Sequence, residues 1–180
     1  MIVKSYEIEK NSSNYLKYNL FLLYGENEGL KKDIRKLLTV AISQQDANIE
    51  LLSLYENDII NNEESYYNSI YSGSLFSNKK IITINNATDK IISQLKNTAD
   101  KYPENVFLII FANILEKKSK LRNFFETNLK TLCIPCYLDN DKDLEIIAKT
   151  EFKKNSITLS RESINLLIEK SNNDRNNLRN

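Results

Sequence analysis

The stretch GENEGLKK (25–32) follows an apolar run and has part of the pattern of a phosphate-binding loop. In the pattern G-x-x-x-x-G-K-[ST], main-chain N–H groups and the lysine hold phosphates, and the hydroxyl binds Mg²⁺. Gly25 and Lys31 fit this pattern, but Leu30 replaces the second glycine and Lys32 replaces the hydroxyl. Leucine resists the backbone conformation that points N–H groups at phosphate. We therefore predict a degenerate loop without a cofactor, and we expect Lys31 to be solvated on a helix.

A carboxylate that could hold Mg²⁺ at the end of a neighbouring strand is also missing from the sequence. One apolar run is followed by Asn85 and Asn86, and another ends in Ala112 and Asn113. Magnesium in phosphate sites is usually bound through carboxylates, which a neutral amide does not replace. The sequence therefore predicts no metal site and no catalytic residue.

Cys133 and Cys136 have the C-x-x-C spacing of a redox pair or of half a zinc site. A redox pair should open a helix, where the helix dipole lowers a thiol pKa, but this pair lies in an apolar run that contains Pro135. Structural burial is favoured, and a thiol-redox protein stays open as an alternative.

The composition excludes several classes of function. The chain of 180 residues has no histidine, so it can hold neither a Ser-His-Asp triad nor a His-based metal site. Its formal net charge of +1 creates no strong field toward nucleic acid or membranes. No apolar stretch approaches a transmembrane length, and no signal-peptide core is present. We expect a cytoplasmic protein without a membrane partner.

Strand-like and helix-like segments alternate along most of the chain. This alternation predicts an α/β fold, a parallel sheet with helices on both faces. The apolar run 105–113 is hydrophobic on both faces, as expected for a central parallel strand. Strands are predicted at 19–25, 48–55, 79–85, 105–113 and 131–138, and helices at 30–42, 63–71, 90–102 and 118–129.

The strand pattern stops after residues 138–143. Helices are predicted at 143–155 and 160–171, the second with Ser160 as its N-cap, and a further polar helix begins near Asp174. We therefore predict an α/β domain over residues 1–140 and a small helical domain over residues 141–180 that is incomplete.

SGSLFSNKK (72–80) places Leu75 and Phe76 side by side among small and polar residues. An apolar pair between two elements usually folds back onto the core, and this is the more frequent outcome for such residues. Alternatively, the pair projects outward to contact another protein. The residues alone leave both possibilities open.

Five stretches in order resemble the delta subunit family of bacterial DNA polymerase III. They are FLLYGENEGLKKD, SLFSNKKIITINN, LIIFANILEKKSKLRNFFE, IPCYLDNDKDLEIIAK and the terminal NDRNNLRN. The resemblance implies an AAA+-like (P-loop NTPase-like) domain, a helical lid domain and a C-terminal collar domain. Because the chain stops where the lid should finish, the collar is expected to be absent, and assembly of this chain into the loader ring is in doubt.

The resemblance also implies a role in DNA replication as a subunit of the clamp loader. Family members bind no ATP themselves, since the gamma/tau subunits bind and hydrolyse it, and the delta subunit opens the beta sliding clamp. A Leu-Phe pair enters a pocket on the clamp, and the matching pair in this chain is Leu75 and Phe76. Gamma/tau and delta prime are further implied partners, with primer–template DNA reached through the assembled complex. An ATP-hydrolysing AAA+ enzyme is the alternative.

Overall fold

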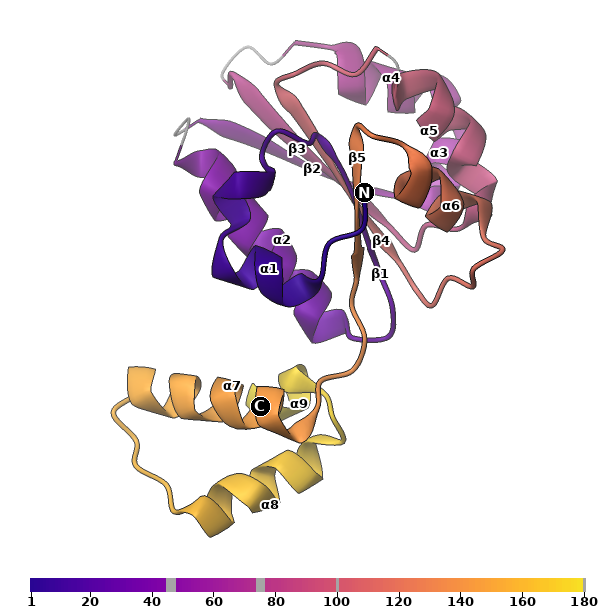
Figure 1. The fold of residues 1–180 in the computed structure, drawn as a ribbon. Coiled ribbons are helices and arrows are strands. Elements are labelled where there is room, and N and C mark those ends of the chain that lie inside the picture. The colour runs from indigo at the N-terminus through magenta and orange to yellow at the C-terminus, as the bar shows by residue number, and fades with distance from the viewer. Residues whose placement is uncertain (45–47, 74–76, 100, 180) are drawn as a thin grey trace.

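The computed structural model describes residues 1–44, 48–73, 77–99 and 101–179. Its centre is a sheet of parallel strands in the order β2-β3-β4-β1-β5, which confirms the predicted α/β fold (Figure 1). β4 lies between β3 and β1, as its apolar residues on both faces predict. The strands are β1 (Leu20–Tyr24), β2 (Ile49–Tyr55), β3 (Lys79–Asn85), β4 (Val106–Ala112) and β5 (Thr131–Pro135).

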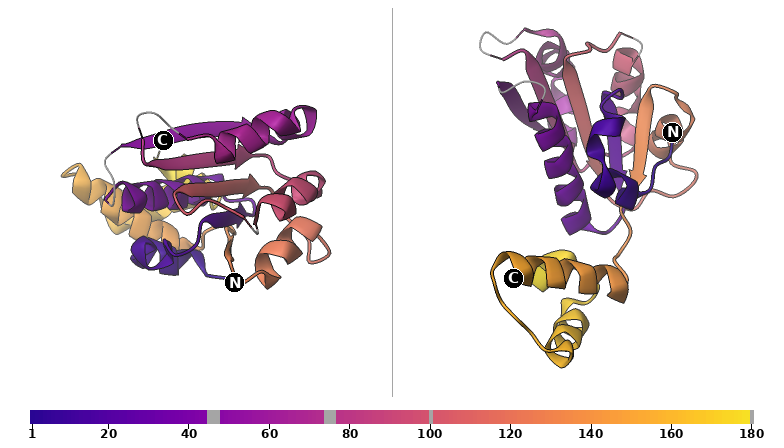
Figure 2. Two further views of the ribbon diagram at one scale, coloured as in Figure 1. Left: turned by 90° about the horizontal axis from the view of Figure 1, so that it is seen from above. Right: turned by 60° about the vertical axis from the view of Figure 1, so that its left-hand side comes forward.

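Helices cover both faces of this sheet. α1 and α2 lie on one face, and α4, α5 and α6 lie on the other (Figures 1 and 2). The short α3 follows directly after β2, and 3₁₀ turns at Ser12–Tyr15 and Asp89–Ile91 complete the connections. The helices of this part are α1 (Ser5–Lys10), α2 (Glu28–Ser43), α3 (Glu56–Asn61), α4 (Glu63–Tyr71), α5 (Ile92–Ala99) and α6 (Lys120–Thr127).

Two hydrophobic cores result, one on each face of the sheet. Residues at alternate strand positions point to opposite faces, so Leu22 belongs to the core under α4 to α6, and Phe21 belongs to the core under α2. Phe125 of α6 and Ile34 of α2 are each completely buried in these cores. The strands are thereby held rigidly, and the loops at their ends are positioned by them.

The last three helices form a separate group beyond the carboxyl ends of β1 and β5 (Figure 1). They are α7 (Asp141–Lys154), α8 (Arg161–Ser171) and α9 (Arg175–Arg179). The Ser160 side chain accepts a hydrogen bond from the Ser163 N–H, which confirms it as the N-cap of α8. Leu144, Ala148, Ile164 and Ile168 form a small core of their own between α7 and α8.

Two short helices and the end of the last strand are the clearest differences from the sequence expectations. α1 and α3 are not predicted, because each is only 6 residues long and presents too short a periodic pattern. The last strand ends at Pro135, although its apolar run continues to residue 138, and Tyr137 and Leu138 are exposed beyond it. No helix within the described residues is long and apolar enough to cross a membrane.

Candidate functional site

The turn after β1 brings the chain back on itself to start α2. Gly25 has a φ of +131°, and a Cβ at this position would overlap the carbonyl oxygen of Cys136. Only glycine tolerates this combination of backbone angle and close approach. The Asn27 side chain then caps α2, accepting a hydrogen bond from the Leu30 N–H at 2.9 Å. The loop therefore has the strand–turn–helix geometry at which phosphate-binding loops occur.

Lys31 is buried, and the expectation that it is solvated is wrong. Its exposed fraction is 1%, and its Nζ donates to the carbonyl oxygens of Gly25 and Ala112, each at 3.0 Å. A third bond joins Nζ to Glu28 Oε1 at 2.5 Å. The ammonium folds back under the loop because these oxygens satisfy its donors. The sequence around Lys31 does not predict this, because one acceptor, Ala112, lies on the distant strand β4. Its hydrogen-bonding capacity is used within the chain.

The other two positions of the motif also lack the features that bind a phosphate. Leu30 is buried in the core under α2, and Lys32 is exposed and carries no hydroxyl for a magnesium ion. Glu28 places a carboxylate in the first turn of α2, where the helix dipole favours an anion. The chain itself thus supplies the negative charge that a phosphate would bring to this helix end.

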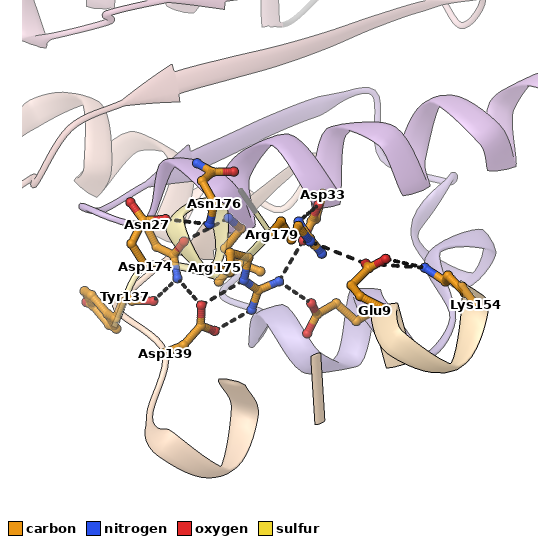
Figure 3. Close-up of polar contacts among 12 residues, drawn as sticks. Glu9, Asn27, Asp33, Tyr137, Asp139, Lys154, Asp174, Arg175, Asn176 and Arg179 are labelled. Carbon is orange, nitrogen blue, oxygen red and sulfur yellow. Dashed lines mark hydrogen bonds and ion pairs between the residues drawn. The ribbon is translucent and has the colours of Figure 1, made fainter. Parts of the chain in front are cut away.

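Arg175 at the start of α9 joins the C-terminal helices to this loop, as Figure 3 shows. Arg175 is 3% exposed, and its guanidinium binds both carboxylate oxygens of Asp139, with Nε to Oδ2 at 2.8 Å. Its Nη1 donates to Glu9 and to Asp33 at 2.9 Å each. Bidentate pairing to a carboxylate is the strongest geometry available to arginine. Arg175 therefore connects α9 to α1, to α2 and to the segment after β5.

Burial and hydrogen bonding shift the pKa values of this cluster in opposite directions. Burial alone would lower the pKa of Arg175, but hydrogen bonds to Asp139, Glu9 and Asp33 outweigh it and raise the pKa. Burial would raise the pKa of Asp33, but hydrogen bonds from Arg179 and Arg175 lower it below its usual value. The charged forms of both partners are therefore favoured by the folded state.

Gly29 of α2 and Asn27 of the loop shape the surroundings of Arg175. A Cβ at Gly29 would overlap the Arg175 Cγ, so a larger residue there would displace the arginine side chain. The Asn27 Nδ2 donates to Asp139 Oδ2 at 2.8 Å and to the Tyr137 carbonyl at 3.1 Å. The first turn of α2 and the segment after β5 are thereby tied together, and Arg175 covers them.

A cleft of about 640 Å³ lies beside this loop, between α2 and the strands β2, β3 and β4. Lys32, Arg35 and Lys36 form its α2 wall, and Asn85 and Asn113 lie at its strand ends. Among the described residues, no cluster of histidine, cysteine, aspartate and glutamate is able to hold a metal ion. The carboxylates of Glu28 and Asp33 and several apolar side chains also line the cleft, so its surface is mixed in charge and polarity.

Cys133 and Cys136 are buried free thiols on opposite faces of the sheet. Cys133 lies in the core under α4 to α6, and Cys136 lies in the core under α2. Burial raises the pKa of each thiol to about 12, so neither is a thiolate at neutral pH. The expected structural burial is confirmed, and this arrangement does not bring the two sulfur atoms together as a redox pair.

A sequence model of the family "DNA polymerase III, delta subunit" matches residues 21–136. The chain belongs to this family. A search among curated proteins found no match. The matched region includes the loop after β1, so the closed, degenerate phosphate loop is a feature of a delta-family chain.

Solved structures show the same fold at low sequence identity. The Bacillus subtilis DNA clamp loader delta protein has 13% identity and a TM-score of 0.56, and the match covers 97% of this chain and 54% of that one. Domain III of the Thermotoga maritima replication initiation protein DnaA has 12% identity and a TM-score of 0.54, with 97% and 77% covered. A replication initiator DnaA bound to AMPPCP and single-stranded DNA has 12% identity and a TM-score of 0.60, with 97% and 58% covered. The delta-family chain therefore has the predicted AAA+-like fold.

The remaining predicted site residues, Leu75 and Phe76, lie outside the described residues. Their assignment as a clamp contact stays a prediction. Arg175 and Asp139 were missed as a site, because they are 36 positions apart and form a pair only through the fold. One signal was available, since the isolated Gly29 in the first turn of a helix indicates close approach of another group.

Proposed function

We propose that this chain is a clamp-loader delta subunit that binds the beta sliding clamp and opens its ring for loading onto primed DNA. The observation that carries the proposal is the family match over residues 21–136, which spans the segment with Leu75 and Phe76. Structural likeness to the Bacillus subtilis clamp loader delta protein supports it. In the cell the chain would act in the cytoplasm.

The chain contributes no ATP hydrolysis under this proposal. The geometry of the loop after β1 supports this, because Lys31 is bonded to two main-chain carbonyls and Glu28. ATP would be bound by gamma/tau subunits, and delta prime would be a further partner in the assembled loader. Residues 1–140 would act as the AAA+-like domain, and residues 141–180 would form the helical lid.

Leu75 and Phe76 are proposed as the residues that contact the clamp. Burying two large apolar side chains in a pocket contributes roughly 1.5–3 kcal/mol for each, and aromatic anchors dominate many protein interfaces. The small neighbours Ser72 and Gly73 on one side, with Ser77 on the other, would leave room for a partner surface.

The test is a binding assay with the sliding clamp of the same organism. We expect Leu75→Ala/Phe76→Ala to weaken binding at least tenfold, equivalent to about 1.4 kcal/mol. Ile114→Ala/Leu129→Ala is the matched control, because both side chains are exposed, at 67% and 89%, in other loops. Unchanged binding by a folded Leu75→Ala/Phe76→Ala variant would show that the pair is not the contact.

A further inference from the structure

Lys80 is a buried lysine just after the segment that joins α4 to β3 (residues 72–78) and carries Leu75 and Phe76. It is the second residue of β3 and is 4% exposed. Its Nζ donates to the carbonyl oxygens of Ser69 and Ser72 at 2.9 and 3.0 Å. Both carbonyls belong to the C-terminal end of α4, which precedes the segment. The ammonium therefore joins residue 72, at the start of the segment, to residue 80, after its end.

This contact is chemically favourable on both sides. The last carbonyls of a helix have no partner within the helix, and the dipole favours a cation at this end. A buried ammonium in turn needs acceptors and a countercharge. Glu50, which lies beside Lys80 on β2, supplies the countercharge at 3.6 Å.

The far end of the same segment is held by a different residue, Asn105. The Asn105 side chain, just before β4, donates to the Asn78 carbonyl at 3.0 Å. The Asn105 carbonyl accepts the Lys80 main-chain N–H at 3.0 Å. Residue 72 is thus fixed to β3 through Lys80, and residue 78 is fixed to Asn105 just before β4. The two ends of the segment are therefore held at a set separation.

We propose that Lys80 is a positioning residue for clamp binding, acting through the segment that carries Leu75 and Phe76. The inference rests on the proposed function. A short segment with fixed ends has fewer conformations to lose when its side chains enter a pocket, so less binding free energy is spent on ordering. Lys80 itself does not touch the clamp.

Lys80→Met tests this role, since methionine keeps an unbranched apolar side chain and removes the donor. Lys96→Met is the control, because it removes the same charge from an exposed position on α5. We expect Lys80→Met to weaken clamp binding about fivefold and Lys96→Met to leave it within about twofold. Circular dichroism and urea unfolding confirm that each variant is folded in the assay.

A double-mutant cycle separates positioning from a general structural effect. In a Leu75→Ala background, which keeps Phe76 and measurable binding, the effect of Lys80→Met should fall to less than half. An equal loss in both backgrounds, or no loss in either, overturns the positioning role while the clamp contact stands. If Leu75→Ala/Phe76→Ala itself binds normally, the clamp contact fails first, and the positioning role falls with it.

Asn105→Ala provides a second, milder variant should Lys80→Met not fold. It removes the bond to the Asn78 carbonyl at the other end of the segment and leaves Lys80 in place. We expect about a twofold to threefold loss of clamp affinity that also shrinks in the Leu75→Ala background. Unchanged affinity would contradict the requirement for fixed ends.

Discussion

Lys31 and Lys80 are two buried lysines that use the same chemistry for different purposes. Each ammonium binds two main-chain carbonyls and faces one glutamate, Glu28 in one case and Glu50 in the other. Lys31 closes the loop after β1, at a place where related folds bind phosphate. Lys80 closes the base of a segment that we propose to face a partner. The Lys31 ammonium is thus fully used within the loop, whereas we propose that the Lys80 ammonium prepares a contact.

The surroundings of the two lysines explain the difference. Above Lys31, Arg175 brings α9 onto the loop and adds contacts with Asp139, Asp33 and Glu9. Lys80 pairs with a single carboxylate, Glu50, among the described residues. The phosphate loop is therefore held from two sides, whereas the segment between α4 and β3 is held at its ends. Four predictions test this comparison.

The largest expected effect is that of Arg175→Met on stability. Removing the guanidinium leaves Asp139, which is also buried, without its ionic partner. Breaking a buried pair from one side costs about 3–5 kcal/mol, measured as the free energy of unfolding in urea. Arg179→Met, whose side chain is 30% exposed, should cost less than about 1 kcal/mol. Equal losses for the two variants would mean that α9 is not fastened through Arg175.

Lys31→Met should have the second largest effect on the free energy of unfolding, without a matching effect on clamp affinity. Two buried carbonyls lose their donor, which costs roughly 1–3 kcal/mol, and Lys80→Met should cost a similar amount. Clamp affinity should fall for Lys80→Met and stay within about twofold for Lys31→Met. A loss of clamp affinity in Lys31→Met as large as in Lys80→Met would show that the two lysines do not differ in role.

The pH dependence of stability should reveal Asp33. Because its pKa is lowered in the folded state, its contribution is fully present above the usual aspartate value of about 4 and is lost as pH falls through the lowered pKa. Asp33→Asn should therefore cost roughly 1–2 kcal/mol at pH 7 and less at pH 3. The exposed Glu104→Gln is the control in urea unfolding at both pH values. A cost for Asp33→Asn that is independent of pH would contradict the charged pairing with Arg175 and Arg179.

The smallest effect concerns the thiols. The Cys136 carbonyl accepts the Asn27 N–H, so labelling of Cys136 reports opening of the phosphate loop, whereas Cys133 lies in the other core. With each thiol pKa at about 12, both should react slowly with a disulfide reagent at pH 8 in the native protein. In Lys31→Met, mass spectrometry should show faster labelling of Cys136 and unchanged labelling of Cys133. Equal acceleration at both would indicate global unfolding.

The sequence predicts the sheet well because its signals are local. The apolar runs that become β1, β3 and β4 are each bounded by polar residues, and their alternation with helices determines the parallel arrangement. The degenerate motif at Gly25 is likewise visible in a few adjacent positions. Features of this kind need no knowledge of distant contacts.

The burial of Lys31 and the Arg175 network could not be derived in the same way. Lys31 is bonded to Ala112, 81 positions away, and Arg175 is bonded to Glu9, 166 positions away. Residue type favours the surface for both, so only the fold reveals them as buried groups. Leu75 and Phe76 were assigned from the family resemblance, and they lie outside the described residues.

A calorimetric titration of the sliding clamp into this chain, with and without ATP and Mg²⁺, tests clamp binding and its independence of nucleotide together. We expect saturable binding with the same Kd in both conditions, and no heat when ATP alone is added, because the phosphate loop is closed by Lys31 and Arg175. Absence of clamp binding, or binding that requires ATP, would contradict this expectation.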